Sequence, residues 1–134
     1  NNMKVDIFTL CDNAQEYGGK LIIIGTFNSI YANKFPTLHP EFALVARVVF
    51  DESEKGIHNI EFDIKKEDED VYILPHGEMT ADTTKTKGKD SIINVVVKGN
   101  NIPIKSAGTY VVTLKVDDKI WKSNLHVVEV KDMK

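Results

Sequence analysis

The sequence predicts an all-β fold, an antiparallel β-sandwich of about eight strands with an immunoglobulin-like general architecture. Apolar residues recur at every second position or in short continuous runs, and no segment sustains the i, i+3, i+4, i+7 pattern of a helix. Glycine, proline and acidic clusters mark turns roughly every 8 to 15 residues, the spacing typical of sandwiches. The composition, with 42% hydrophobic and 28% charged residues, is that of a chain that folds around a core.

The first two strands are expected to form a hairpin. Residues 5–12 carry enough apolar side chains to be partly covered on both faces. Residues 20–31, which include Leu-Ile-Ile-Ile, form the second strand. Residues 13–19 are expected to connect the two, because their closing glycine pair tolerates the positive φ angles of a tight reversal. Gly25 lies inside the second strand and predicts a bulge or a bend there.

Six further strands are expected after a crossover loop. Residues 33–40 form that loop, because Pro36 and Pro40 remove two backbone donors. Residues 42–50 are β-branched, aromatic and nearly uncharged, which predicts a central strand. The five remaining strands follow from alternation or from short apolar runs, and they cover residues 57–65, 71–82 with an interruption at Pro75-His76-Gly77, 91–98, 110–116 and 120–130.

One domain, residues 3–131, accounts for all eight strands, because no linker or change of composition divides the chain. Asn1 and Asn2, which precede Met3, are interpreted as residues left over from expression. The formal charge of −3 disfavours nucleic acid as a partner, and the longest apolar runs are too short to span a membrane. The single cysteine, Cys11, cannot form an internal disulfide, so we expect a cytoplasmic protein.

Two groups of motifs resemble a bacterial family of small proteins known only as a domain of unknown function. The first group comprises residues 3–6 (Met-Lys-Val-Asp), 10–12 (Leu-Cys-Asp), 17–21 (Tyr-Gly-Gly-Lys-Leu), 25–27 (Gly-Thr-Phe), 35–36 (Phe-Pro) and 39–40 (His-Pro). The second comprises residues 107–110 (Ala-Gly-Thr-Tyr) and 116–118 (Val-Asp-Asp), and it is similar to closing hairpins of many immunoglobulin-like sandwiches. The resemblance implies a compact cytosolic β-sandwich, and it implies no activity.

Residues able to do chemistry are scattered, so we expect no cofactor, no metal and no enzymatic activity. The histidines show no metal-binding spacing: His39 and His76 are expected in loops, His126 on a strand, and a zinc site assembled only in three dimensions is the alternative. Acidic turns at residues 51–54, 67–70 and 117–118 could gather at one end and bind calcium, although solvated turns are also commonly acidic. Cys11 is expected to be a small buried side chain rather than a nucleophile.

The segment most suggestive of function combines residues 12–20 with residues 35–40. Asp12, Glu16, Tyr17 and His39 could form a contact surface at one end of the sheet. In the structural alternative, Asp12 begins the turn and Tyr17 packs as a lid on the core. We therefore expect a non-catalytic protein-interaction or assembly module, which uses a sheet edge or the Tyr17 loop to contact another protein or a second copy. The alternatives are a calcium- or small-ligand-binding domain and, third, a hydrolase.

Overall fold

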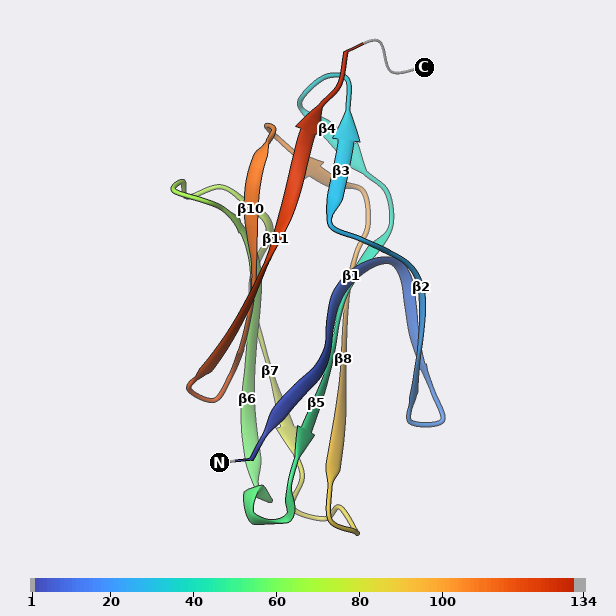
Figure 1. Ribbon diagram of the computed structural model, residues 1–134, viewed down its shortest axis with the longest axis vertical. Helices are drawn as coiled ribbons and strands as arrows, with labels where there is room; N and C mark the ends of the chain where they lie inside the picture. The colour runs from blue at the N-terminus through green and yellow to red at the C-terminus, as the bar shows by residue number, and fades with distance from the viewer. Residues whose placement is uncertain (1, 132–134) are drawn as a thin grey trace.

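The computed structural model describes residues 2–131, and within them it contains eleven strands, one 3-10 helix and no α-helix (Figure 1). The all-β prediction is confirmed, whereas the expected number of about eight strands was too low. Asn1, one of the two residues interpreted as left over from expression, lies outside the described residues. The elements are β1 (Lys4–Tyr17), β2 (Lys20–Phe27), β3 (Ser29–Ala32), β4 (Thr37–His39), β5 (Phe42–Phe50), η1 (Glu52–Glu54), β6 (Ile57–Lys66), β7 (Tyr72–Asp82), β8 (Ser91–Gly99), β9 (Ile102–Ile104), β10 (Gly108–Val116) and β11 (Lys119–Glu129).

The three additional strands are β3, β4 and β9. Residues 20–31 break at Asn28, and β2 and β3 then join different sheets. β4 lies inside the segment predicted to be a loop, and it pairs with β9 in a separate two-stranded sheet. The loop prediction holds at residues 33–36 and 40 and was wrong at β4, because Pro36 and Pro40 flank this strand instead of occupying it, so its three residues keep their backbone donors.

Two larger sheets face each other across the core. The first has the strand order β2-β1-β5-β8 and is antiparallel throughout. The second has the order β3-β11-β10-β6-β7, and its pairs are antiparallel except for the parallel pairing of β11 with β3. β5 lies inside the first sheet and is buried over its whole length except at Arg47, so the predicted central strand is confirmed.

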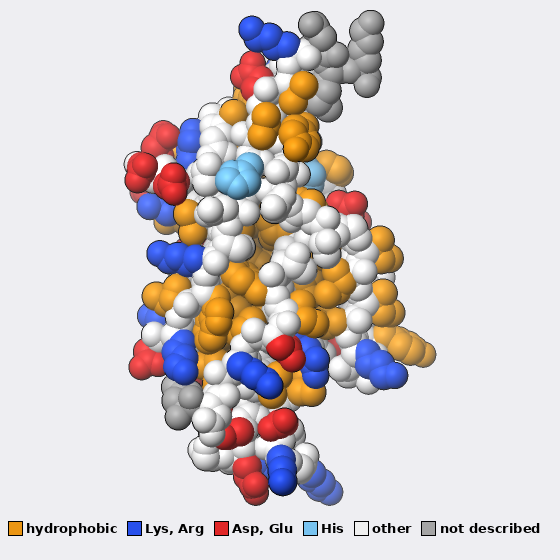
Figure 2. Space-filling model, in the orientation of Figure 1, with side chains coloured by type: hydrophobic (Ala, Val, Ile, Leu, Met, Phe, Trp, Pro, Cys, Tyr) orange, Lys and Arg blue, Asp and Glu red, His pale blue; other side chains and the backbone are white. Residues whose placement is uncertain are grey.

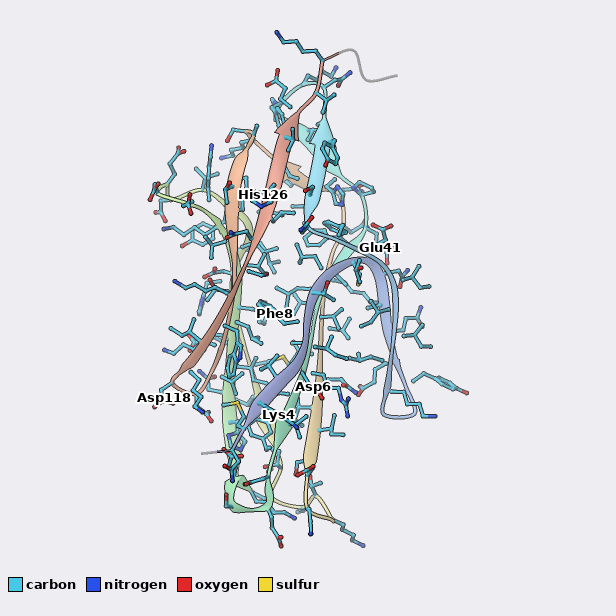
Figure 3. All side chains as sticks on the ribbon, viewed as in Figure 1. Lys4, Asp6, Phe8, Glu41, Asp118 and His126 are labelled. Atoms are coloured by element: carbon cyan, nitrogen blue, oxygen red, sulfur yellow. The ribbon has the colours of Figure 1, made fainter. Side chains whose placement is uncertain are left out.

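The core forms between the facing sides of the two sheets. Leu44 and Val48 of β5 and Val112 and Leu114 of β10 are all almost completely buried, at 0 to 1% exposure. Phe8 of β1 touches both halves of this core and lies between the sheets (Figure 3). Alternation along β10 places Thr113 and Lys115 on the opposite, outer face, so the second sheet has one dry face and one wet face.

The first sheet differs because it rolls over its own outer face. β1 runs along β5, bends, and continues as one arm of a hairpin with β2 (Figure 1). The bend coincides with Gly25, whose φ is +70°. The bend predicted as one alternative at Gly25 is therefore present, whereas no bulge forms, because the pairs Cys11–Thr26 and Asn13–Ile24 keep the same register on either side. The connection between β1 and β2 is shorter than the predicted one, residues 13–19. β1 remains a strand to Tyr17, and only Gly18 and Gly19 form the turn.

A second small core lies beneath the rolled hairpin. Cys11, Ala43 and Val45 on the outer face of the first sheet are buried, and Ala14, Leu21 and Ile23 of the hairpin pack with them. This explains why β5 is apolar on both faces: one face meets the second sheet, and most of the other lies under the hairpin. Cys11 is completely buried, as predicted.

Candidate functional site

The four residues predicted to form a contact surface lie in two separate places. Asp12 lies at the bend of β1, and His39 lies in β4 rather than in a loop. Glu16 and Tyr17 lie at the far end of the hairpin. Five residues of extended strand separate Asp12 from Tyr17, which is roughly 16 Å. The structure therefore does not bring the four side chains together.

His39 is packed among aromatic rings near the bend. Its ring centroid lies 5.8 Å from that of Phe27 and 5.7 Å from that of Phe42. Its Nε2 atom is buried and has no hydrogen-bond partner among the described residues. Burial lowers the pKa of His39, and the negative charge of Asp12 opposes this shift only in part. His39 is thus a packed ring whose charged form is disfavoured by burial.

The hairpin tip is fastened to the outer face of the first sheet. The Asn94 Nδ2 of β8 donates hydrogen bonds to Glu16 Oε2 at 2.8 Å and to the Gly19 carbonyl at 3.1 Å. Tyr17 is 77% exposed, so the interpretation of this side chain as a lid on the core was wrong. The turn is closed by two glycines alone, and Tyr17, on the strand just before it, faces away from the sheet beneath.

An apolar row continues from Tyr17 along β2. Ile22 and Ile24 are 47% and 60% exposed, and alternation places them on the same face of the hairpin as Tyr17, whose cross-strand neighbour is Lys20. Figure 2 shows hydrophobic side chains along the margin of the molecule where Figure 1 draws this hairpin. β2 is also an edge strand, because it pairs only with β1 among the described strands. The Leu-Ile-Ile-Ile run signalled a strand, and nothing in it signalled that alternate isoleucines stay exposed.

A second group of polar side chains meets on the outer face of the other sheet. Glu61 of β6 and Glu78 of β7 are cross-strand neighbours, and His76 lies beside both. The His76 Nε2 atom is 3.4 Å from Glu61 Oε1 and 3.3 Å from Glu78 Oε1. His76 belongs to β7, which continues through Pro75 and Gly77, so the predicted interruption and the loop position of His76 were both wrong. Pro75 is tolerated because β7 is an edge strand.

The three acidic turns do not gather. The turn at residues 51–54 precedes β6, and the turn at residues 67–70 follows it, so the length of β6 separates them (Figure 1). Asp118 marks the β10–β11 turn (Figure 3). Asp117 of that turn is linked to the first acidic turn through His58, whose Nδ1 lies 2.8 Å from Asp117 Oδ2 and whose Nε2 lies 2.6 Å from the Glu54 carbonyl oxygen. The gathering expected for a calcium site was therefore wrong.

Cys11, the cysteine considered as a nucleophile, is inaccessible to solvent. The Cys11 Sγ atom is completely buried and lies 3.3 Å from the Asn13 carbonyl oxygen. Burial raises the pKa of the Cys11 thiol, which disfavours the thiolate that nucleophilic chemistry requires. The imidazole of the exposed His126, on the outer face of β11, lies 3.4 Å from the Thr109 hydroxyl through its Nδ1 atom (Figure 3).

These features define an all-β protein of two facing sheets with a rolled edge hairpin. Over residues 6–128 the sequence matches a protein family described as Family of unknown function (DUF6941), and the chain belongs to this family. The resemblance to a domain of unknown function is confirmed at that level. No curated protein and no solved structure matches the chain in the corresponding comparisons. No helix among the described residues is long and apolar enough to cross a membrane.

Proposed function

We propose that this protein is a non-catalytic assembly module, in which β2 pairs with β2 of a second copy. One observation carries the proposal: β2 is an eight-residue edge strand that exposes Ile22 and Ile24 and carries no charge except Lys20. Edge strands of monomers are usually kept short, charged or interrupted by proline, because an open edge pairs with other chains. β2 has none of these protections along residues 21–24.

Three other edge strands are better protected than β2. β3 has only four residues, and β7 contains Pro75 and two register shifts. β8 is nine residues long and exposes Ile92 at 45%, but the same face carries Asn94, which fastens the hairpin, and Lys98, a charge of the kind that discourages pairing. The contrast singles out β2 as the edge that favours a partner.

A second copy suits β2 because the strand is complementary to itself. In an antiparallel pair centred on Ile23, Ile22 of one chain faces Ile24 of the other, and Lys20 faces Thr26. The exposed isoleucines thus cover one another, and no like charges face each other. Such a contact is isologous, so it closes as a dimer and does not propagate. A contact of one strand is smaller than a standard interface of roughly 1,600 Å², so we expect a weak, concentration-dependent dimer.

Analytical ultracentrifugation over a wide range of protein concentration tests the proposal. The wild-type protein is expected to move from monomer to dimer, and Ile22→Lys with Ile24→Lys is expected to remain monomeric, because charges placed at the edge repel. Ile120→Lys is the matched control, since Ile120 is 55% exposed on the outer face of the other sheet. A wild-type protein that is monomeric throughout, or a double variant that dimerises equally well, would refute self-association through β2. If the chain stays monomeric but sediments in a one-to-one complex with a different protein, that protein would be the partner instead of a second copy.

The same proposal includes the bacterial, cytoplasmic setting and the immunoglobulin-like architecture expected from the sequence. A lone, buried cysteine supports a reducing compartment. The β10–β11 hairpin, which lies between β3 and β6 in the second sheet, supports the architecture. The buried Cys11 and the packed His39 support a non-catalytic role, because neither has the accessible, activated environment of a nucleophile or base.

A further inference from the structure

The Glu61, His76 and Glu78 cluster has the geometry of a metal site. We propose that Glu61 Oε1, His76 Nε2 and Glu78 Oε1 bind one divalent ion of the zinc type on the outer face of the second sheet. The three side chains each offer one ligand atom, and these atoms all lie within 4.8 Å of one another. The inference is independent of the proposed dimer, because β6 and β7 belong to the sheet that does not contain β2.

The distances within the cluster agree with tetrahedral coordination. Bonds from zinc to nitrogen or oxygen ligands are about 2.0–2.2 Å, which places neighbouring ligand atoms of a tetrahedron about 3.3–3.6 Å apart. The observed separations from His76 Nε2 are 3.4 Å to Glu61 and 3.3 Å to Glu78. Two edges of the tetrahedron are therefore already in place, and the ion requires only small side-chain rotations.

One ligand is held in position by its neighbours. Glu61 is the least exposed of the three, with a side chain 20% accessible. Its second oxygen, Oε2, accepts a hydrogen bond from Asn59 Nδ2 at 3.3 Å and lies 3.8 Å from Lys115 Nζ. These contacts leave Oε1 directed at His76. Partners that orient a ligating carboxylate in this way are a common feature of metal sites, where they fix the ligand before the ion arrives.

The backbone next to the cluster is also specified by its sequence. Gly77 lies between His76 and Glu78 and pairs with Phe62. A Cβ atom at residue 77 would lie 2.5 Å from two atoms of the Phe62 ring, so only glycine lets the ring lie against β7. The register of β6 against β7 shifts directly after this pair. The close approach therefore helps to hold Glu61 opposite Glu78, with His76 beside them.

The remaining coordination position faces open space. A shallow pocket of about 180 Å³ adjoins the cluster and is lined by Asp63, Thr113 and Lys115 together with Glu61 and His76. Three protein ligands with a fourth position left for water is a usual arrangement for zinc. The ligand set also favours this class of ion, because imidazole nitrogen suits zinc and cobalt, whereas calcium takes six to eight oxygens.

The same distances would also suit hydrogen bonds that link His76 to the two carboxylates with no ion between them. A metal titration separates the two explanations, because only a metal site gains a saturable ligand. The protein is first freed of metal with a chelator, the chelator is removed, and zinc chloride is added in an isothermal titration. Cobalt(II) in a parallel titration reports the coordination geometry through its visible absorption.

The expected result is one zinc ion per chain, with a visible cobalt spectrum of tetrahedral type. His76→Ala and Glu78→Gln are each expected to weaken zinc binding by about ten-fold or more. Both side chains are half exposed or more, so these variants keep the fold, which circular dichroism verifies. His126→Ala is the control, since this exposed histidine lies on the same outer face and outside the cluster. Absence of a saturable site in the wild type, or unchanged binding by His76→Ala, would overturn the proposal.

Discussion

Replacing Gly25 by alanine tests the bend that rolls β1 and β2 over the first sheet. A Cβ atom at residue 25 would lie 2.6 Å from Asp12 Oδ2 and 3.0 Å from Asp12 Cγ, and φ is +70°. Gly18 is the matched position, because its φ is +57° but no atom lies within 4 Å of the added Cβ. Both variants carry the left-handed backbone strain, and only Gly25→Ala also displaces Asp12.

The magnitudes follow from these two terms. Left-handed strain costs about 1–2 kcal/mol, and the reduced entropy of the unfolded chain returns about 0.4–1 kcal/mol, so Gly18→Ala is expected to cost about 1 kcal/mol. Forcing Asp12 from its rotamer adds about 0.5–1.5 kcal/mol, which brings Gly25→Ala to about 2 kcal/mol. For a chain of 134 residues, each kcal/mol of lost stability lowers the melting temperature by roughly 4 °C.

Urea unfolding, with the free energy extrapolated to water, measures both variants. In an Asp12→Ala background, the excess cost of Gly25→Ala over Gly18→Ala is expected to disappear, because the displaced carboxylate is gone. Equal costs for the two glycine variants, or an excess that persists without Asp12, would refute the argument that close packing at the bend requires glycine.

Three further predictions concern other parts of the fold. Burial lowers the pKa of His39 below its usual 6.5, so the unfolded chain takes up the proton first and stability should fall as the pH drops below about 6.5. His39→Gln should flatten this decline in urea midpoints measured against pH, and an equally steep decline would contradict the assignment. Asn94→Ala should release the hairpin tip and speed hydrogen exchange at Ile22 and Ile24, whose amides face β1, with little effect in β10, whereas uniform changes would point to global destabilisation. Cys11, completely buried, should react with a thiol reagent only as fast as the protein opens, and rapid labelling of the folded chain would contradict its burial.

The two proposals use opposite sides of the molecule. β2 lies at the rolled edge of the first sheet, whereas the zinc-type cluster lies on the wet face of the second sheet. A dimer that forms through β2 therefore leaves the cluster open to solvent. Each proposal can fail without affecting the other, because the variants that test one do not touch residues of the other.

Local pattern was a reliable guide wherever a residue's role depended on its neighbours along the chain. The apolar run from Phe42 to Phe50 predicted a strand inside the sheet, and β5 is one. Gly25 predicted a bulge or a bend, and the chain bends there with a φ of +70°. Pattern failed at Tyr17, whose aromatic character suggested a lid on the core. A single exposed aromatic residue at the end of a hairpin has the same local sequence as a buried one, and only the path of the hairpin distinguishes them.

By itself, the sequence determined the all-β class, the positions of most turns and the burial of Cys11, because alternation and turn chemistry act over a few residues. The tertiary structure alone decided which faces are covered and which distant side chains meet. Ile22 and Ile23 are adjacent residues of the same type. The roll of the sheet nevertheless covers the face of β2 that carries Ile23 and leaves the face that carries Ile22 exposed. Glu61 and His76 are fifteen positions apart, and the β6–β7 register places them in contact. Strand register and sheet curvature arise from pairing between distant segments, which a period of two along one strand does not encode.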